Sequence, residues 1–591
     1  MTNNTVSLFD ISKSLLAMLP RAPQAGLATL KALTLNKTTV GSIGAVLEQQ
    51  ADATPHAVAI QYLEQRYSYQ EFNQAANRIA HYLRSVGVGK GDAVAILMEN
   101  RPEVLMAVAG IVKLGAVASM INTSQRGDVL IHSLTLVKPK KIIVGDELVA
   151  ALTEVLPKLG KGTLADCLYQ RDEADNKAPK GMVDLDHELR QQPTDNLAIT
   201  QQLTLDNPAY YIFTSGTTGL PKASVMSHLR WMRAMYGMGQ AAMFMQPEDV
   251  FYCPLPLYHN NALTLAWGSA LGAGASLALA RKFSASGFWD DIRHHNATTF
   301  CYIGELCRYL LAQPEKASDK THFVRACMGN GLRPEIWDEF RDRFGINHIN
   351  EFYGASEGNL AFTNAFNLER TAGFCPLSFS VVEYDIDADE PVRDKKGHMI
   401  KVKPGEAGLL ITEVTERMSF DGYTDKGASD SKLMRNVFKN GDCYFNTGDL
   451  VRDQGYKHIA FVDRLGDTFR WKGENVATTE VEGAVAKWAQ VETAAVYGVE
   501  VPGADGRAGM AAITPNCALD AFDFAGFLAH LNDLLPSYAV PQYLRFREAQ
   551  EMTGTFKFRK VELKKAGFDP VACGEPVYAL SGTGYQPLVA Q

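Results

Sequence analysis

Apolar residues follow helical and strand-like spacings in alternation from about Val40 onward. Short apolar runs at 93–98 and 141–144 predict buried strands, and the longer pattern at 100–114 predicts a helix. The clearest helical spacing precedes two glycines, at 87 and 89, and comprises Phe72, Ala75, Ile79, Tyr82 and Leu83. Alternation of this kind is typical of α/β proteins.

An uncharged stretch at 262–280 is long enough to cross a bilayer. Its glycines, Gly268, Gly272 and Gly274, divide it into a helix-like half and a strand-like half. We therefore expect a buried helix, turn and strand here rather than a membrane span.

The pattern changes near residues 463–468. Just beyond, Thr479 followed three residues later by Glu482 predicts a helix start with a capping box. A chain of 591 residues is long enough for several domains. We predict an N-terminal segment at 1–39, a large α/β body at 40–463 and a smaller, mobile α+β domain at 464–591.

Residues 1–40 are basic in an otherwise acidic chain. Apolar residues crowd positions 8–19, and a single acidic residue, Asp10, faces four basic ones: Lys13, Arg21, Lys31 and Lys37. Such a segment can lie on an anionic membrane surface, or it can pack on the body of the protein, and the sequence leaves both readings open. Because no signal peptide is recognisable, we expect a cytoplasmic location, peripheral on the inner membrane face under the first reading.

Composition and charge narrow the class of function. The formal net charge of −8 argues against general nucleic-acid binding, which needs a basic surface. The nine cysteines form no CxxC pair, so a zinc ribbon or thioredoxin-type site is not expected and a reducing compartment suits the chain. The sequence gives no indication of oligomeric state.

The strongest local signal is a loop rich in hydroxyl groups and glycine that follows an aromatic run at 210–213. Glycines let backbone N–H groups turn inward and hydroxyls add donors, so such a loop can wrap phosphate oxygens. Its spacing differs from that of a Walker A loop. The candidate nucleotide-binding residues here are Thr214, Ser215, Gly216, Thr217, Thr218, Gly219 and Lys222.

This loop resembles the signature of the adenylate-forming superfamily, which includes acyl-CoA synthetases, luciferases and the adenylation domains of peptide synthetases. Further segments resemble the motifs of that superfamily in the expected order. They are Gly329-Asn330-Gly331, the aromatic motif at 352–358, the Tyr–x–x–Gly–Asp motif that ends at Asp449, and the hinge at Asp463-Arg464. The resemblance runs from about Val40 to about Asp569 and implies a large α/β body with a small, mobile α+β C-terminal domain.

Within the superfamily, the chain is most similar to the fatty acid transport proteins, also called very-long-chain acyl-CoA synthetases. The similar stretches lie at 466–482, 496–510 and 553–560. This resemblance implies an AMP-forming ligase that uses ATP, Mg²⁺ and coenzyme A on a long or very long fatty acid, and it leaves coupling to fatty acid uptake open. Two alternatives stay open: a fatty acyl-AMP ligase that serves a carrier protein, and a membrane-associated lipid uptake protein with secondary catalysis.

The same resemblance implies roles for single residues in nucleotide binding. Glu357 is the candidate magnesium ligand, and Ser356 stands where the family usually has threonine. Tyr353, followed by Gly354, would stack on adenine, with Gly329, Asn330 and Gly331 on the adenine side. Asp449 would accept hydrogen bonds from the ribose, and Arg464 would contact the nucleotide or stabilise the hinge.

Lys557 is the candidate catalytic lysine of the adenylation step, with Lys560 as the alternative assignment. A mobile ammonium can bridge the carboxylate and the α-phosphate as charge builds in the transition state. The resemblance further implies that the small domain rotates and presents Gly473 to the pantetheine arm of coenzyme A. It places Tyr258 and His259 beside the acyl pocket.

Overall fold

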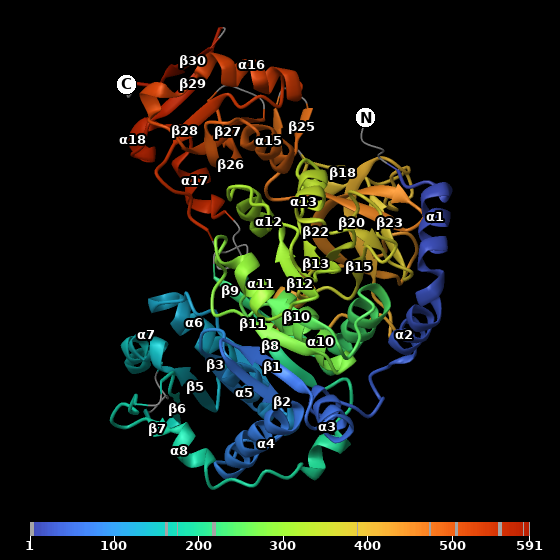
Figure 1. The fold of residues 1–591 in the computed structure, drawn as a ribbon. Coiled ribbons are helices and arrows are strands. Elements are labelled where there is room, and N and C mark those ends of the chain that lie inside the picture. Colours follow the sequence, from blue (N-terminus) through green and yellow to red (C-terminus); the bar gives the residue numbers. More distant parts are fainter. Residues whose placement is uncertain are drawn as a thin grey trace. The chain divides into compact units, whose positions relative to one another are not determined.

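The computed structural model describes residues 5–159, 164–173, 175–215, 220–386, 388–471, 474–502, 506–552, 558–582 and 584–589. The chain forms two compact units (Figure 1). The larger unit comprises Leu8–Cys375 and Val414–Leu433. The smaller unit comprises Met1–Ser7, Pro376–Glu413 and Met434–Gln591.

The first sheet of the larger unit has seven strands in the order β7-β6-β5-β3-β4-β8-β9. Its neighbours are parallel except for β8 and β9, which are antiparallel. The bounds are β3 (Ala93–Leu97), β4 (Val117–Met120), β5 (Lys141–Gly145), β6 (Cys167–Gln170), β7 (Val183–Asp184), β8 (Pro208–Ser215) and β9 (Pro221–Ser227). Both faces are covered, one by α4 (Tyr69–Ser85) and α5 (Pro102–Lys113), the other by α6 (Gly127–Val137) and α7 (Val149–Val155).

The second sheet of the larger unit runs β2-β1-β11-β10-β12-β13-β14 and is parallel except between β1 and β2. Two short antiparallel strands, β15 (Ala361–Thr363) and β16 (Gly373–Phe374), continue from β14. The other bounds are β1 (Val58–Tyr62), β2 (Gln65–Ser68), β10 (Val250–Cys253), β11 (Ser276–Leu279), β12 (Thr299–Ile303), β13 (Ala326–Asn330) and β14 (Ile349–Gly354).

Helices α4 and α5 lie between these two sheets, because α4 contacts β1 and β2 while α5 contacts β3 and β4. Gly110 permits their close approach, since a Cβ there would lie 2.7 Å from the carbonyl oxygen of Ala76. At the end of α5, the buried Nζ of Lys113 donates to Oε1 of Glu48 on α3 (Ile43–Ala53) at 2.9 Å. It also donates to Oδ1 of Asn73 and of Asn77 on α4, both at 2.6 Å, so one ammonium ties three helices together.

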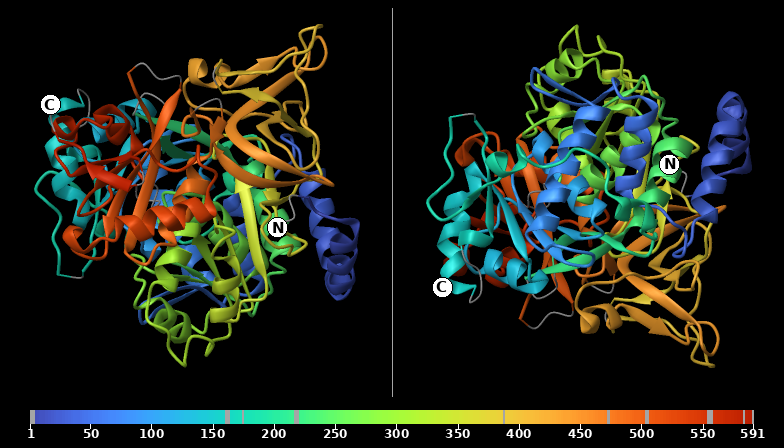
Figure 2. Two further views of the ribbon diagram at one scale, coloured as in Figure 1. Left: turned by 90° about the horizontal axis from the view of Figure 1, so that it is seen from above. Right: turned by 90° about the horizontal axis from the view of Figure 1, so that it is seen from below.

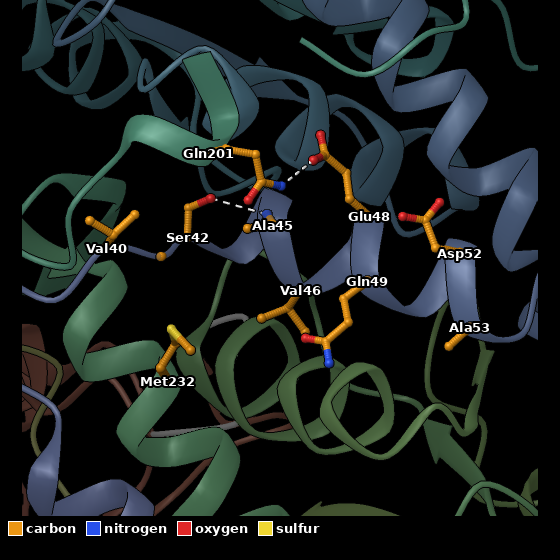
Figure 3. Close-up of a pocket in the computed structure, with 11 residues that line it drawn as sticks. Val40, Ser42, Ala45, Val46, Glu48, Gln49, Asp52, Ala53, Gln201 and Met232 are labelled. Atoms are coloured by element: carbon orange, nitrogen blue, oxygen red, sulfur yellow. Dashed lines mark hydrogen bonds between the residues drawn. The ribbon is translucent and has the colours of Figure 1, made fainter. Parts of the chain in front are cut away.

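A cavity of about 660 Å³ opens beside α3 (Figure 3). In it, Gln201 Nε2 donates to Glu48 Oε2 at 2.6 Å, and Ser42 Oγ accepts from the Ala45 backbone N–H at 3.1 Å. None of the residues expected to bind nucleotide or acyl chain lines this cavity, so we assign it to the scaffold.

The uncharged stretch forms the π-helical segment η7 (Asn261–Ala266), helix α10 (Trp267–Ala273) and strand β11. Gly274 has a φ of +72° and ends α10. The expected buried helix, turn and strand is therefore confirmed. Within the described ranges, the apolar helices are all too short to cross a bilayer.

The N-terminal segment folds as α1 (Leu8–Met18), the short turn η1 (Leu19–Arg21) and α2 (Ala22–Thr34). Helix α2 packs on α9 (His228–Ala234) and on the π-helical segment η6 (Met235–Ala242). Helix α1 contains no buried residue and stands clear of the strands of the larger unit in Figure 2.

The smaller unit contains an antiparallel run of strands and a mixed five-stranded sheet. Strands β17 (Phe379–Val382), β20 (Ala407–Glu413), β22 (Cys443–Gly455) and β23 (His458–Arg464) form an antiparallel run. A five-stranded sheet follows, with β26 (Val491–Glu500), β27 (Arg507–Pro515), β28 (Tyr543–Phe546), β29 (Val577–Ser581) and β30 (Gly584–Pro587). Helices α15 (Thr478–Ala486) and α16 (Phe524–Leu534) complete its core, so the expected α+β texture is present.

The capping box predicted for α15 is wrong. The helix begins after Ala477, which makes no side-chain cap. Glu482 instead accepts a hydrogen bond from the Val496 backbone N–H at 3.0 Å and pairs with Lys560 Nζ at 2.9 Å. A tertiary partner has therefore displaced the local one. The division at 39 and 463 stays a prediction.

Candidate active site

The ends of the predicted phosphate loop are held by the pairing of β8 with β9. In this hairpin Thr214 lies opposite Lys222, and Ser215 lies opposite Pro221. Gly216, Thr217, Thr218 and Gly219 lie outside the described residues, so their phosphate contacts stay predictions. The hairpin nevertheless fixes where the loop starts and where it ends.

The adenine-side motif and the aromatic motif lie at one edge of the second sheet. Strands β13 and β14 are parallel neighbours with Gly329 opposite Glu351, so the residues at their carboxyl ends, Asn330, Tyr353 and Gly354, meet there. Ligands of open α/β sheets bind at this edge. Gly331 follows with a φ of +81°, a conformation that favours glycine.

Glu351 fixes the turn at Gly331 through hydrogen bonds to the backbone of the turn. Its Oε1 accepts hydrogen bonds from the backbone N–H groups of Gly331 and of Leu332, the latter at 3.2 Å, and its Oε2 accepts from Tyr302 Oη. Burial raises the pKa of Glu351 to about 8. Sequence reasoning missed this residue, because a lone glutamate in a strand pattern gives no signal of its partners.

Ser356 and Glu357 are tied to the phosphate hairpin by three side chains. The carbonyl oxygen of Ser356 accepts from Arg230 Nη2 at 2.7 Å and from Ser224 Oγ at 2.8 Å. Oε1 of Glu357 accepts from Tyr423 Oη at 2.7 Å. The two expected nucleotide-binding motifs, at 214–222 and 352–358, are thus brought together.

The acyl-side residues Tyr258 and His259 lie in the turn between β10 and η7. Their rings contact each other at a centroid distance of 4.5 Å, and Tyr258 is buried. Just after them, Asn261 Nδ2 donates to Asn330 Oδ1 at 3.3 Å. The acyl-side segment is therefore joined to the adenine-side motif, and π-helical turns such as η7 are frequent at functional sites.

In the smaller unit, the two candidates Asp449 and Arg464 lie opposite each other on β22 and β23. Arg464 Nε is 3.8 Å from Asp449 Oδ1, and the arginine side chain is half exposed. Lys560 is nearly buried and holds both Glu482 and Thr478 Oγ1, the latter at 3.1 Å. Lys557 and Gly473 lie outside the described residues.

Comparison with known families agrees with this geometry. The model of the AMP-binding enzyme family matches residues 47–410, and the model of its C-terminal domain matches residues 480–557. The chain belongs to the AMP-binding enzyme family. The expected α/β body with a separate C-terminal α+β domain is thereby confirmed.

Curated relatives place this AMP-binding enzyme near the fatty acid transport proteins. The medium/long-chain-fatty-acid–CoA ligase FadD6 of Mycobacterium tuberculosis is 45% identical over 591 residues, which cover all of this chain and 96% of that protein. Long-chain fatty acid transport protein 2 of Rattus norvegicus is 40% identical over 549 residues, 91% of this chain and 87% of that protein. The resemblance to this branch is therefore confirmed.

Solved structures share the fold at low sequence identity. The anthranilate CoA ligase AuaEII in complex with anthranoyl-AMP aligns with a TM-score of 0.76 at 19% identity, over 89% of this chain and 97% of that one. ATP-bound MatB from Rhodopseudomonas palustris aligns with a TM-score of 0.74 at 23% identity, over 89% and 99%.

The variant Glu351→Gln tests the anchor beneath Gly331 through the pH dependence of stability. Glu351 loses its proton near pH 8 in the folded protein but near its ordinary pKa of about 4.5 in the unfolded chain. Between these values the folded state retains a proton that the unfolded state has lost. This group should therefore lower the free energy of unfolding by up to about 1.4 kcal/mol per pH unit as the pH rises.

Glutamine does not titrate, so the difference in melting midpoint, variant minus wild type, should rise from about pH 5 to about pH 8. Thermal melts at several pH values measure this difference. A difference that stays flat across the range would contradict the buried, proton-retaining carboxyl.

Proposed function

We propose that this enzyme is an AMP-forming ligase that joins long or very long fatty acids to coenzyme A. The observation that carries the proposal is the meeting of Lys222, Tyr423 and Glu357 at the end of the phosphate hairpin. A basic side chain and a carboxylate at this place suit a polyphosphate with its divalent cation. FadD6, which matches the whole chain, is named a medium/long-chain-fatty-acid–CoA ligase.

The proposed reaction has two steps. A carboxylate oxygen of the fatty acid attacks the α-phosphorus of ATP, and the bond to pyrophosphate breaks. The sulfur of coenzyme A then attacks the carbonyl carbon of the acyl-adenylate, and AMP leaves with the electron pair of the C–O bond. Because the first step brings two anions together, positioning and charge neutralisation supply most of the catalysis.

Residues of the larger unit would hold the nucleotide in this scheme. The loop from Thr214 to Lys222 would donate to the phosphates, and the motif at 329–331 with Tyr353 would line the adenine. Glu357, with Ser356 beside it, would hold Mg²⁺, which neutralises phosphate charge when bound. The fixed carbonyl of Ser356 and the hydrogen-bonded Oε1 of Glu357 support this, because both side chains extend from a rigid backbone.

Residues of the smaller unit would complete the reaction. Asp449 would accept from the ribose and Arg464 would reach the nucleotide, while Gly473 would face the pantetheine arm after rotation of the small domain. Lys557 would bridge carboxylate and α-phosphate. The alternative lysine, Lys560, is occupied by Glu482 and Thr478, which favours Lys557 for the mobile role. Tyr258 and His259 would lie beside the acyl chain.

We also propose that α1 holds the protein on the inner face of an anionic membrane. Large apolar side chains of the N-terminal helices point into solvent: Leu8, Phe9, Leu15, Leu16, Leu19, Leu27 and Leu30. Within α1, Leu8 and Leu15 are seven residues apart, and so are Phe9 and Leu16, so these four side chains share one side of the helix. The exposed Lys13 lies beside them. An apolar face turned outward with basic flanks is the arrangement of a helix that lies in a lipid interface.

The reaction itself is tested by giving the purified protein ATP, magnesium and fatty acids of several lengths, with and without coenzyme A. The proposal predicts AMP and acyl-CoA in equal amounts when coenzyme A is present. AMP without thioester would favour a carrier-protein acceptor. The absence of both products would favour a lipid uptake protein and would contradict the ligase assignment.

Replacement of the proposed catalytic lysine tests its role. Lys557→Ala should slow adenylate formation, measured by pyrophosphate exchange, by about a hundredfold or more, with ATP affinity retained. Lys565→Ala is the control, because Lys565 is exposed and, among the described residues, its ion pair is with Glu562 three residues earlier. An unchanged exchange rate in Lys557→Ala would show that another residue performs this step.

The membrane proposal is tested by flotation with vesicles of phosphatidylglycerol and phosphatidylcholine. Burial of a phenylalanine or leucine side chain is worth roughly 1.5–3 kcal/mol, so Phe9→Ser/Leu16→Ser should weaken binding about tenfold or more. The control Phe323→Ser/Leu63→Ser replaces side chains of similar exposure elsewhere, 72% and 65% against 76% and 68%. Equal binding of the two double variants would contradict a specific role of α1.

A further inference from the structure

Tyr423 belongs to none of the motifs that the sequence analysis found. It lies in the loop between β20 and β22, where residues 422–424 form a short antiparallel pairing with β9. The Val225 N–H donates to the Gly422 carbonyl at 3.0 Å, and the Thr424 N–H donates to the Ala223 carbonyl at 2.9 Å. This pairing places Tyr423 beside the strand that leaves the phosphate loop.

Tyr423 contacts both Lys222, a candidate phosphate-binding residue, and Glu357, the candidate metal ligand. Its hydroxyl donates to Glu357 Oε1 at 2.7 Å, and the Lys222 ammonium lies 5.5 Å from the centroid of its ring. A cation at this distance from an aromatic face is attracted by the ring quadrupole. Only 8% of the Tyr423 surface is exposed, while Lys222 and Glu357 are half-buried.

In the hydrogen bond between Tyr423 and Glu357, the phenol is the donor and the carboxylate is the acceptor. An ordinary phenol is protonated at neutral pH, and an ionised carboxylate has only acceptor oxygens. The phenol therefore stays protonated at working pH and can only donate to the carboxylate. Among the described residues, the other oxygen of Glu357 accepts no hydrogen bond.

A second pair of contacts fixes the adjoining peptide. Arg230 is half-buried in α9, and its two terminal nitrogens donate to the carbonyls of Ser356 and Val225, at 2.7 Å and 2.8 Å. Ser224 Oγ also donates to Ser356 O. The backbone just before Glu357 is therefore fixed to β9. Tyr423 fixes the carboxylate at the end of the Glu357 side chain, so both ends of this residue are held.

We propose that Tyr423 is a positioning residue that orients Glu357 for the divalent cation of the bound nucleotide and keeps Lys222 beside it. This rests on the proposed role of Glu357 as the magnesium ligand. By holding Oε1, the phenol fixes the carboxylate plane and leaves Oε2 directed to the cation. Outer partners that orient a metal ligand in this way usually change metal affinity or activity 10–100-fold.

The experiment compares Tyr423→Phe with a control of the same chemistry. Phenylalanine keeps the ring beside Lys222 and removes only the hydroxyl. Tyr384→Phe is the matched control, because Tyr384 Oη donates to Asp389 Oδ1 at 2.8 Å, in a carboxylate contact that involves no candidate site residue. ATP affinity of the full chain is measured by calorimetry with MgCl₂ and again with EDTA.

The ratio of the two affinities is the readout, since loss of packing alone would change both equally. We expect Tyr423→Phe to reduce the magnesium-dependent gain in ATP affinity roughly tenfold, with the affinity in EDTA unchanged. Tyr384→Phe should leave the ratio as in the wild type. Melting midpoints show that each variant is folded.

Glu357→Gln separates failure of this inference from failure of the proposed function. If Glu357→Gln keeps the full magnesium-dependent gain, Glu357 is not the metal ligand and the proposal on Tyr423 falls with it. If Glu357→Gln loses the gain but Tyr423→Phe keeps it, the positioning role alone is overturned. In the double variant, a loss no larger than that of Glu357→Gln supports the proposal, and an additive loss contradicts it.

Discussion

The candidate nucleotide site depends on the antiparallel pairing of β8 with β9 at the edge of an otherwise parallel sheet. The pairing closes a hairpin across the phosphate loop and sets Lys222 opposite Thr214. Two further segments of the candidate site, at 422–424 and at Ser356, are hydrogen-bonded to β9 or to the helix after it. The segment at 422–424 pairs with β9, and Ser224 within β9 and Arg230 in the helix that follows both donate to the carbonyl of Ser356. The loop proposed to bind the phosphates therefore starts and ends on paired strands, which would lower the conformational entropy that binding must overcome.

Buried polar groups in this region are used to fix backbone rather than to react. Arg230 is half-buried, and burial lowers its pKa, but its terminal nitrogens donate to carbonyl acceptors in place of solvent. Glu351 holds the turn at Gly331 in the same manner, with the backbone as its partner. Such anchors have discrete, hydrogen-bonded positions, so the turn at Gly331 and the peptide before Glu357, the candidate adenine and metal sites, are preorganised.

Helices, strands and motifs formed by consecutive residues could be predicted from the sequence. Contacts between segments that are distant in the sequence could not. The buried strands at 93–98 and 141–144, the helix around 72–83 and the uncharged helix–turn–strand all follow from local periodicity. The motifs at 214–222, 329–331 and 352–358 could be identified because each is contiguous. Tyr423, Arg230 and Glu351 could not, because their partners lie in other motifs and a single tyrosine or arginine has no periodic signature. Glu482 is a further example. Its position predicts a helix-capping role, but its carboxylate forms an ion pair with Lys560, which is distant in the sequence.

The central claim is that the hydroxyl-rich turn between β8 and β9 grips the phosphates of ATP. A crystal structure with a non-hydrolysable ATP analogue and magnesium tests it most directly. The account predicts phosphate oxygens within hydrogen-bond distance of the backbone N–H groups between Thr214 and Lys222, with Glu357 on the cation. A triphosphate bound elsewhere, with this turn facing bulk solvent, would contradict it.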